Sequence, residues 1–190
     1  MNEYPDFSNK VTYFKSFIPD NIYSMDEMRL CLSRVKGNLN EMFGIEEDNI
    51  SIKKMKKSDI DKAQIVENSC FVHPYDMNET YGKNKLSLCA FYNDNFAGYV
   101  CTYYVLDEVN IMTVAVKEIY RRKGIGEKLM KELIQVSKEL GMKKIYLEVR
   151  YSNANARLLY EKVGFEKCGI RKDYYTDPKE DAILYEYNII

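Results

Sequence analysis

The stretch Arg121–Gly126 (R-R-K-G-I-G) has the composition of an anion-binding loop. It follows Ile111–Val116, an apolar and β-branched run that indicates a buried strand, and it precedes a pattern with helical periodicity. Glycines let a ligand approach the backbone closely, and the first N–H groups of a helix have no partner within it. Arg121, Arg122 and Lys123 add positive charge at the same place. The stretch therefore predicts a site for a cofactor that carries a pyrophosphate.

A carboxylate lies in a second short strand pattern, Ile145–Arg150. Alternation puts Glu148 on the same face as Tyr146 and Arg150, opposite the aliphatic face. A central parallel strand is usually apolar on both faces, and Glu is rarely buried unpaired. A carboxylate in this strand is therefore unusual and indicates a specific structural or catalytic role. The residues alone leave two explanations open: structural pairing with Arg150 or a nearby amide, and service as a general base.

Two further residues follow the carboxylate on the next helical pattern, which covers 155–162. Asn153 stands where an N-cap residue is expected, because its side chain can accept a hydrogen bond from the first turn. Tyr160 lies among apolar positions of the same pattern, and the residues alone favour an ordinary half-buried aromatic there.

The composition limits the classes of function. With 28 Lys and Arg against 29 Asp and Glu, the formal net charge is −1, which argues against direct nucleic-acid binding. The five cysteines are scattered without a C-x-x-C pair and His73 is the only histidine, so we expect reduced thiols and no metal site. No apolar run is long enough to span a bilayer, so we expect a cytoplasmic protein with no membrane partner.

The first 50 residues form an N-terminal extension in this interpretation, ahead of a domain at 51–190, with the boundary at the polar run Glu46–Asn49. Ser24 and Glu27 make a capping box for an amphipathic helix at about 25–43. Its apolar stripe favours packing on its own domain over a coiled-coil-like dimer seam, which predicts a monomer or weak dimer.

The remaining chain alternates strand and helix patterns. A strand and a helix come first, then three hairpin-linked strands, and then helix, strand, helix and a last strand. Because a strand–helix–strand unit makes a crossover to a parallel neighbour, this order predicts an α/β fold whose mixed, mainly antiparallel sheet has one parallel crossover and is flanked by helices. The strands are expected at 50–57, 86–92, 96–104, 111–116, 144–149 and 184–189, and the helices start near 58, 126 and 155.

Two nucleotide-binding motifs are excluded at the glycine loop. G-x-G-x-x-G fails because its last position holds Leu129, and no G-K-S/T of a P-loop follows. What remains, R-x-x-G-x-G from Arg121 to Gly126 after V-A-V, resembles the Q/R-x-x-G-x-G/A motif of the GCN5-related N-acetyltransferases. The resemblance implies acetyl-CoA as co-substrate, with its pyrophosphate on the loop amides and its pantetheine along the preceding strand. The implied cofactor-binding residues are Val114, Ala115, Val116, Arg121, Arg122, Lys123, Gly124, Ile125, Gly126, Glu127 and Asn153.

The second half of the chain narrows the resemblance. The runs 147–165 (L-E-V-R-Y-S-N-A-N-A-R-L-L-Y-E-K-V-G-F) and 174–182 (Y-Y-T-D-P-K-E-D-A) are similar to the RimI-type protein N-alpha-acetyltransferases. That similarity implies Glu148 as general base, directly or through water, and Tyr160 as the acid that protonates the leaving thiolate. It further implies a protein N-terminus as acceptor, from a small-subunit ribosomal protein. The acceptor would lie between Tyr174 and Tyr175 on one side and Phe71 and Tyr75 on the other, with Tyr75 where many members have Trp.

The chemistry of the amine agrees with an N-terminal acceptor. An α-amino group has a pKa near 8 and a lysine about 10.4, so deprotonating lysine costs about 3 kcal/mol more. A single general base, Glu148, therefore suits an α-amino acceptor, which loses its proton more easily than a lysine does. Two alternatives stay open: acetylation of a small-molecule amine by the same fold, and a non-catalytic coenzyme A-binding module that uses residues 1–50 as a partner surface.

Overall fold

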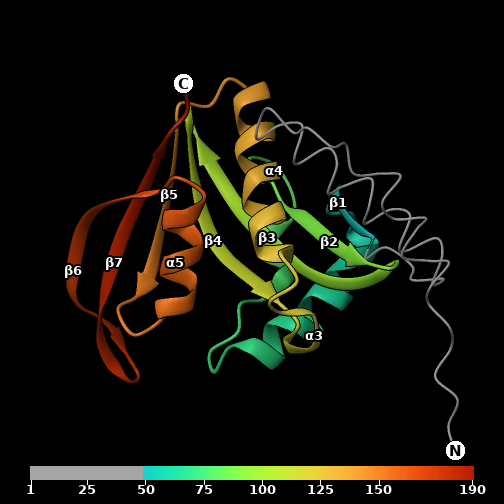
Figure 1. Ribbon diagram of the computed structural model, residues 1–190, viewed down its shortest axis with the longest axis horizontal. Helices are drawn as coiled ribbons and strands as arrows, with labels where there is room; N and C mark the ends of the chain where they lie inside the picture. Colours follow the sequence, from blue (N-terminus) through green and yellow to red (C-terminus); the bar gives the residue numbers. More distant parts are fainter. Residues whose placement is uncertain (1–48) are drawn as a thin grey trace, which may run out of the picture. The chain divides into compact units, whose positions relative to one another are not determined.

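The computed structural model describes residues 49–190. The predicted helix at about 25–43 and its packing or dimer seam lie outside the described residues, and the division at residue 50 stays a prediction. The described chain forms one seven-stranded sheet in the order β1-β2-β3-β4-β5-β7-β6 (Figure 1). The strands are β1 (Ile50–Lys54), β2 (Leu88–Tyr92), β3 (Asn95–Val105), β4 (Glu108–Val116), β5 (Lys144–Arg150), β6 (Glu166–Thr176) and β7 (Lys179–Asn188).

Neighbouring strands run antiparallel except for β4 and β5, which are parallel. The helix α4 (Ile125–Glu139) makes the crossover between them. The predicted fold class is therefore confirmed. The other helices are α3 (Ile60–Cys70) and α5 (Ala154–Lys162), with short 3-10 turns η1 (Lys57–Asp59), η2 (Met77–Thr80) and η3 (Glu118–Tyr120).

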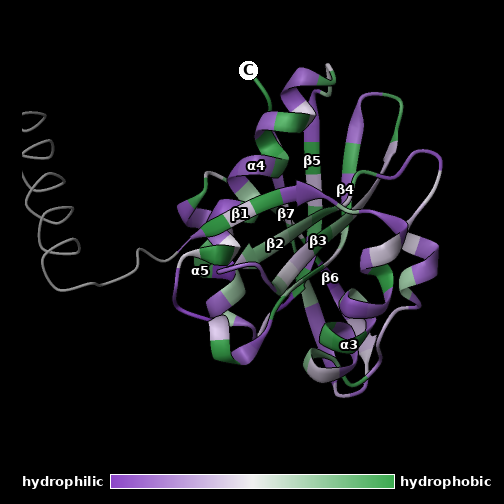
Figure 2. Cartoon of the chain, turned by 90° about the vertical axis from the view of Figure 1, so that its right-hand side faces the viewer, coloured by the Kyte–Doolittle hydropathy of each residue, from purple (hydrophilic) through white to green (hydrophobic). Residues whose placement is uncertain are grey.

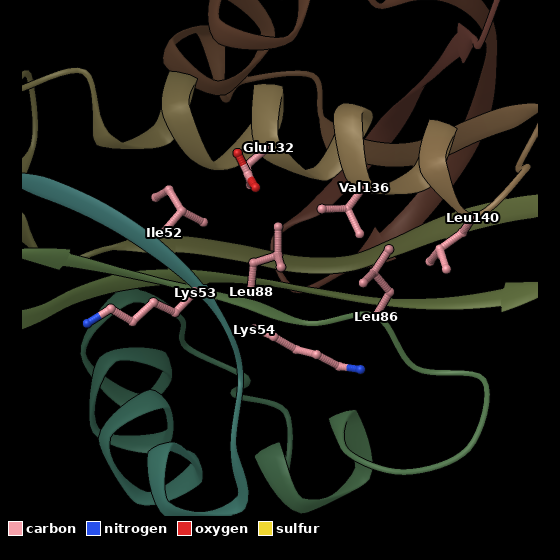
Figure 3. A pocket seen from close by; sticks show the side chains of 8 residues that line it. All are labelled: Ile52, Lys53, Lys54, Leu86, Leu88, Glu132, Val136 and Leu140. Atoms are coloured by element: carbon pink, nitrogen blue, oxygen red, sulfur yellow. The ribbon is translucent and has the colours of Figure 1, made fainter.

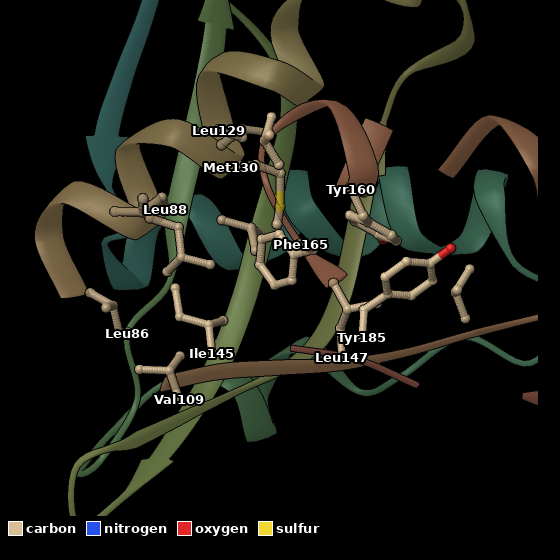
Figure 4. Close-up of a cluster of buried hydrophobic side chains, with 14 of the residues drawn as sticks. Leu86, Leu88, Val109, Leu129, Met130, Ile145, Leu147, Tyr160, Phe165 and Tyr185 are labelled. Atoms are coloured by element: carbon tan, nitrogen blue, oxygen red, sulfur yellow. The ribbon is translucent and has the colours of Figure 1, made fainter. Parts of the chain in front are cut away.

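The sheet is buried on both faces at its centre. Side chains of α4 and α5 pack on one face in the larger core cluster, where Leu129 and Met130 meet Ile145, Leu147 and Tyr160 (Figure 4). The helix α3 covers the other face through Ala63 and Val66, which are fully buried. Hydrophobic colour concentrates on the central strands in Figure 2, whereas α3 and α4 carry both colours, as helices with one buried face do. Strand β3 is accordingly buried at successive residues, not at alternate ones.

The helix α4 begins and ends at glycines in the left-handed region, with φ of 81° at Gly124 and 74° at Gly141. Leu129 and Leu133 are buried as the periodicity predicts. The spacing of Leu129, Leu133, Val136 and Leu140 predicts one buried face, but this face ends before Leu140, which is 53% exposed because the helix ends at Glu139.

The turn before β4 lies earlier than predicted. The run Asp107–Asn110 between the strands expected at 96–104 and 111–116 predicts a turn, but Val105 pairs with Glu108, and Leu106 turns the chain with φ of 55°. Glu108 and Asn110 are polar, so the sequence pattern does not indicate a strand here. The strand forms because β3 and β5 supply hydrogen-bonding partners for its backbone.

Strand β6 was missed by the sequence interpretation, and β7 begins at Lys179, well before the predicted start at 184. Nearly all of β6 is exposed because it is the edge strand and pairs only with β7. A strand that buries neither face has no alternating apolar pattern to reveal it. Tyr174 and Tyr175 therefore lie on a strand and not in a surface loop.

Gly98 allows β3 and β4 to approach closely. A Cβ built there would lie 2.4 Å from the carbonyl oxygen of Ala115 and 3.0 Å from Cα of Val116. We expect Gly98→Ala to lower the free energy of unfolding by about 1–3 kcal/mol, because backbone atoms must move apart. Gly169→Ala is the matched control, since its Cβ would meet Leu184 at an ordinary 3.9 Å. Urea denaturation measures both, and equal losses would contradict this explanation.

Candidate active site

Strands β4 and β5 part after a short contact. They pair only where Glu108–Asn110 lies beside Lys144–Tyr146. Beyond this point β4 continues to Val116 with β3 as its one strand partner, and β5 continues beside β7. The backbone of β4 that faces away from β3 is thus available to a ligand over 111–116.

Alternation along β4 identifies the residues that face the opening. Lys117 N–H donates to the carbonyl of Ala97 on β3 at 2.8 Å, so the backbone groups of Val116 and Val114 face away from β3. The carbonyl of Val116 already accepts from Arg121 Nε at 3.1 Å. Ala115 faces β3 with its backbone, and its side chain is buried. Val114 is therefore the residue best placed to offer both backbone groups to a bound chain.

The glycine loop presents free amides at the start of α4. The first backbone hydrogen bond of the helix joins Lys128 N–H to Gly124 O at 3.0 Å. The N–H groups of Ile125, Gly126 and Glu127 precede it and have no acceptor within the helix. Positive φ at Arg122 and Gly124 turns the chain into the helix. This geometry fits a pyrophosphate, because an anion is stabilised by such amides and by the helix dipole.

The charged side chains of the loop are mostly engaged within the protein. Lys123 Nζ donates to Tyr92 Oη at 2.8 Å, and Arg121 Nη2 lies 3.6 Å from Cys70 Sγ. Glu127 is held by Lys131 at 2.8 Å and by Lys162 at 2.5 Å. The backbone amides therefore carry more of the predicted anion site than the sequence suggested, and Glu127 can contribute only its N–H group favourably.

Gly126 has a further role that the loop motif does not require. A Cβ at this position would lie 3.1 Å from Cδ2 of Leu159 on α5, so glycine lets the two helices pack closely. The contact also fixes α5, which carries Tyr160. Asn153 caps this helix as predicted, with Oδ1 accepting from Ala156 N–H at 3.2 Å.

Glu148 lies on β5, two residues beyond the last pair with β4. Its carboxylate is 28% exposed and its Oε1 lies 2.6 Å from Nη1 of Arg171 on β6. The carboxylate also interacts with the hydroxyl of Tyr174, and this hydrogen bond is the main cause that raises the pKa of Tyr174 to about 12. The carboxylate is thus partly open to solvent and oriented from one side.

Arg150 does not pair with Glu148, which removes one of the structural alternatives. Its guanidinium binds Glu180 at 3.3 Å and the carbonyl of Asp177 at 2.8 Å. The cation beside Glu148 is Arg171, a residue that the sequence interpretation did not name. It was missed because β6 was missed, and only the pairing of β6 with β7 brings Arg171 to β5.

Tyr160 is 7% exposed, and its ring lies 6.0 Å from that of Phe165 and 6.2 Å from that of Tyr185 (Figure 4). Burial raises the pKa of Tyr160 above its ordinary value, and nearby Tyr175 adds to the effect. Its hydroxyl forms no hydrogen bond with any residue from 49 to 190. A buried phenol that stays protonated at neutral pH is suited to donate a proton.

The predicted acceptor walls come from distant segments. Tyr174 and Tyr175 pack edge to face with ring centres 5.1 Å apart. Burial raises the pKa of Tyr175, and the neighbouring Glu148 raises it further. His73 Nε2 lies 3.4 Å from Asp177 Oδ2, so the loop that contains Phe71 and Tyr75 reaches the β6–β7 turn.

A second carboxylate was missed by sequence reasoning. Glu67 on α3 is 1% exposed and accepts a hydrogen bond from Tyr75 N–H at 3.0 Å. The signal was present, since Glu67 shares the apolar helix face of Ile60, Ala63 and Val66. A carboxylate on a buried helix face needs hydrogen-bond donors. One donor here is the N–H group of Tyr75, in the loop that is predicted to bind the acceptor.

Other features of the described chain lie away from this site. A hollow of about 190 Å³ between β1 and α4 is lined by Ile52, Leu88, Glu132 and Val136 among others, and contains none of the predicted site residues (Figure 3). Residues 49–190 contain no cluster of three metal-ligating side chains. No helix within that range is long and apolar enough to cross a membrane.

Comparison with known proteins is consistent with this geometry. Residues 53–165 match the acetyltransferase (GNAT) family. The [Ribosomal protein bS18]-alanine N-acetyltransferase of Escherichia coli strain K12 is 34% identical over an alignment of 140 positions, and the alignment covers 70% of this chain and 94% of that protein.

Solved structures show the same fold. The crystal structure of the ribosomal-protein-S18-alanine N-acetyltransferase from Escherichia coli superimposes with a TM-score of 0.70 and 33% identity, over 74% of this chain and 94% of that one. Arabidopsis thaliana NAA60 in complex with acetyl-CoA shares the fold with a TM-score of 0.69 and 22% identity, over 74% of this chain and 100% of its own. The parted strands, the amide-lined helix start and these similarities lead to one conclusion: the chain belongs to the acetyltransferase (GNAT) family.

Proposed function

We propose that this enzyme transfers an acetyl group from acetyl-CoA to the α-amino group at the N-terminus of a protein, and that the acceptor is a ribosomal protein. The observation that carries the proposal is the position of Glu148, just beyond the point where β4 and β5 part and beside the aromatic walls. The E. coli relative, whose name specifies the alanine of ribosomal protein bS18, supports the choice of acceptor.

The cofactor residues fit the group they would hold. The free amides of 125–127 would bind the pyrophosphate, and the outward backbone of Val114 would pair with the pantetheine amides. When bound, acetyl-CoA supplies an activated thioester carbonyl. The chain then has to position an amine against it and move two protons.

Glu148 accepts the proton that the amine loses as the new carbon–nitrogen bond forms. Arg171 and Tyr174, both on β6, orient the carboxylate, which would take the proton from the amine directly or through an intervening water. An open carboxylate suits an amine whose pKa is near 8, because a sizeable fraction is already neutral at physiological pH.

Tyr160 delivers a proton to the sulfur that leaves. Its raised pKa keeps the hydroxyl protonated through the neutral range, so the proton is available whenever the thiolate develops. The rings of Phe165 and Tyr185 pack beside it and keep the phenol buried. The aromatic pair Tyr174 and Tyr175 would hold the backbone of the acceptor against Tyr75.

Removing the proposed base tests the mechanism. We expect Glu148→Gln to lower kcat for an alanine-initiated peptide by about 100- to 1,000-fold, since general base catalysis contributes that much. The Kd for acetyl-CoA should stay within about twofold, because the cofactor residues lie on β4 and α4. Stopped assays with peptide and acetyl-CoA measure the first, and calorimetry measures the second.

Glu186→Gln is the matched control for this variant. Glu186 is a carboxylate on the neighbouring strand β7, 3.4 Å from Lys144 and outside the proposed site. Its replacement should leave kcat unchanged. Full activity of Glu148→Gln, or an equal loss in both variants, would exclude Glu148 as the base.

Removing the proposed acid gives a separate prediction. Tyr160→Phe should lower kcat by about 100-fold while the melting temperature barely changes, because the hydroxyl forms no hydrogen bond within the described chain. Tyr187→Phe is the matched control. The ring of Tyr187 lies 5.4 Å from that of Phe165 in the same cluster, and this variant should retain full kcat.

The pH dependence of the wild-type enzyme checks the same assignment. Because the pKa of Tyr160 is raised, its proton is retained as the pH increases, and kcat should not fall between pH 7 and about 9. A decline in that interval that disappears in Tyr160→Phe would show that the phenol ionises early, against this account.

A further inference from the structure

Two polar side chains of α3 hold the backbone of the loop that contains Tyr75. Gln64 and Glu67 lie one helical turn apart. Glu67 Oε1 accepts from Tyr75 N–H at 3.0 Å, and Gln64 Nε2 donates to Tyr75 O at 3.0 Å. Gln64 Oε1 also accepts from Met77 N–H at 2.9 Å. Both backbone groups of Tyr75 are therefore bonded to side chains of one helix.

The second oxygen of Glu67 ties the same loop to the sheet. Oε2 accepts from the hydroxyl of Tyr99 on β3 and from Thr113 Oγ1 on β4, the latter at 3.1 Å. Tyr99 is fully buried and Thr113 is 7% exposed. No Lys, Arg or His within residues 49–190 lies in ion-pair distance of this carboxylate. Its three donors thus replace the water it would otherwise require.

The arrangement links the two halves of the site. Thr113 immediately precedes Val114, whose backbone faces the opening between β4 and β5. The loop that contains Tyr75 reaches the β6–β7 turn through the contact of His73 with Asp177, and the side chain of Tyr75 is 47% exposed. A carboxylate that is itself 1% exposed cannot touch an acceptor, so its effect must pass through the residues it holds.

We propose that Glu67 and Gln64 are positioning residues that fix the backbone of Tyr75, and with it the acceptor wall, relative to the strand that binds the cofactor. This inference rests on the proposed function, because it assigns the loop to acceptor binding. We call the hydrogen bonds from Gln64 and Glu67 to the backbone of Tyr75 and Met77 the clamp. A positioning role differs from a purely structural one because loss of the clamp weakens acceptor binding more than it lowers stability.

Gln64→Ala and Glu67→Ala test the clamp by kinetics. We expect either variant to raise the KM for the acceptor peptide about tenfold, as loss of one or two hydrogen bonds implies, with the KM for acetyl-CoA within twofold in Gln64→Ala. Glu67→Gln keeps an acceptor for Tyr75 N–H and should restore most of the affinity. Val66→Ala is the control, because Val66 is equally buried on the same helix and contacts the loop through no polar group.

Amide hydrogen exchange on the full chain gives a readout that does not depend on turnover. The amide of Tyr75 should exchange at least tenfold faster in Glu67→Ala, and that of Met77 in Gln64→Ala, whereas Val66→Ala leaves both protected. Unchanged exchange in both clamp variants overturns the proposal. The proposal is also overturned if Val66→Ala raises the KM for the acceptor as much as Gln64→Ala and Glu67→Ala do. If Glu67→Ala does not fold, Gln64→Ala carries both measurements. A wild-type enzyme that acetylates no N-terminal peptide would instead refute the proposed function.

Discussion

The proposed site depends on the early end of the pairing between β4 and β5. Backbone N–H and C=O groups near a protein core need partners, and β4 loses its partner on one edge after Asn110. Strand β5 keeps β7 as its neighbour, so it stays fixed while β4 turns toward the glycine loop. The edge of β4 is thereby left for a ligand that can pair with a strand, and pantetheine, with its amides, is such a ligand. Glu148 is the first outward-facing polar residue of β5 beyond the last contact.

Several elements depend on that opening. The helix α4 follows β4 along the chain and has free amides in its first turn, while α5, which carries Tyr160, packs on α4 at Gly126. The β6–β7 hairpin adds Arg171 and the tyrosine pair, and α3 holds the facing loop through Glu67. The proposed chemistry therefore draws on elements from α3 to β7, so changes in packing should affect substrate binding as well as stability.

The sequence predicted those parts that have a local signature. Glycines and helical periodicity identified α4, Asn153 marked the start of α5, and Asn93 and Asp94, both with positive φ, form the predicted hairpin turn. The acetyltransferase family followed from the loop motif and the runs after it. The pairing of Arg171 with Glu148 could not be predicted in this way. Arg171 lies on β6, a strand that buries neither face and therefore has no apolar pattern.

The same limit explains the missed role of Glu67. Its donors come from β3, from β4 and from a loop, at separations of 32, 46 and 8 residues, so no local pattern could pair them. The helical periodicity placed the carboxylate on a buried face but could not show what it was bonded to. Long-range polar contacts of this kind become visible only once the topology is known.

The central claim is that the acceptor is the α-amine of a protein. It is tested most directly with one peptide that carries both a free N-terminal alanine and an internal lysine, incubated with the wild-type enzyme and acetyl-CoA. Fragmentation mass spectrometry then locates the acetyl group. The account predicts acetylation at the α-amine and none at the lysine. Acetylation of the lysine alone, or transfer to small amines with none to the peptide, would contradict it.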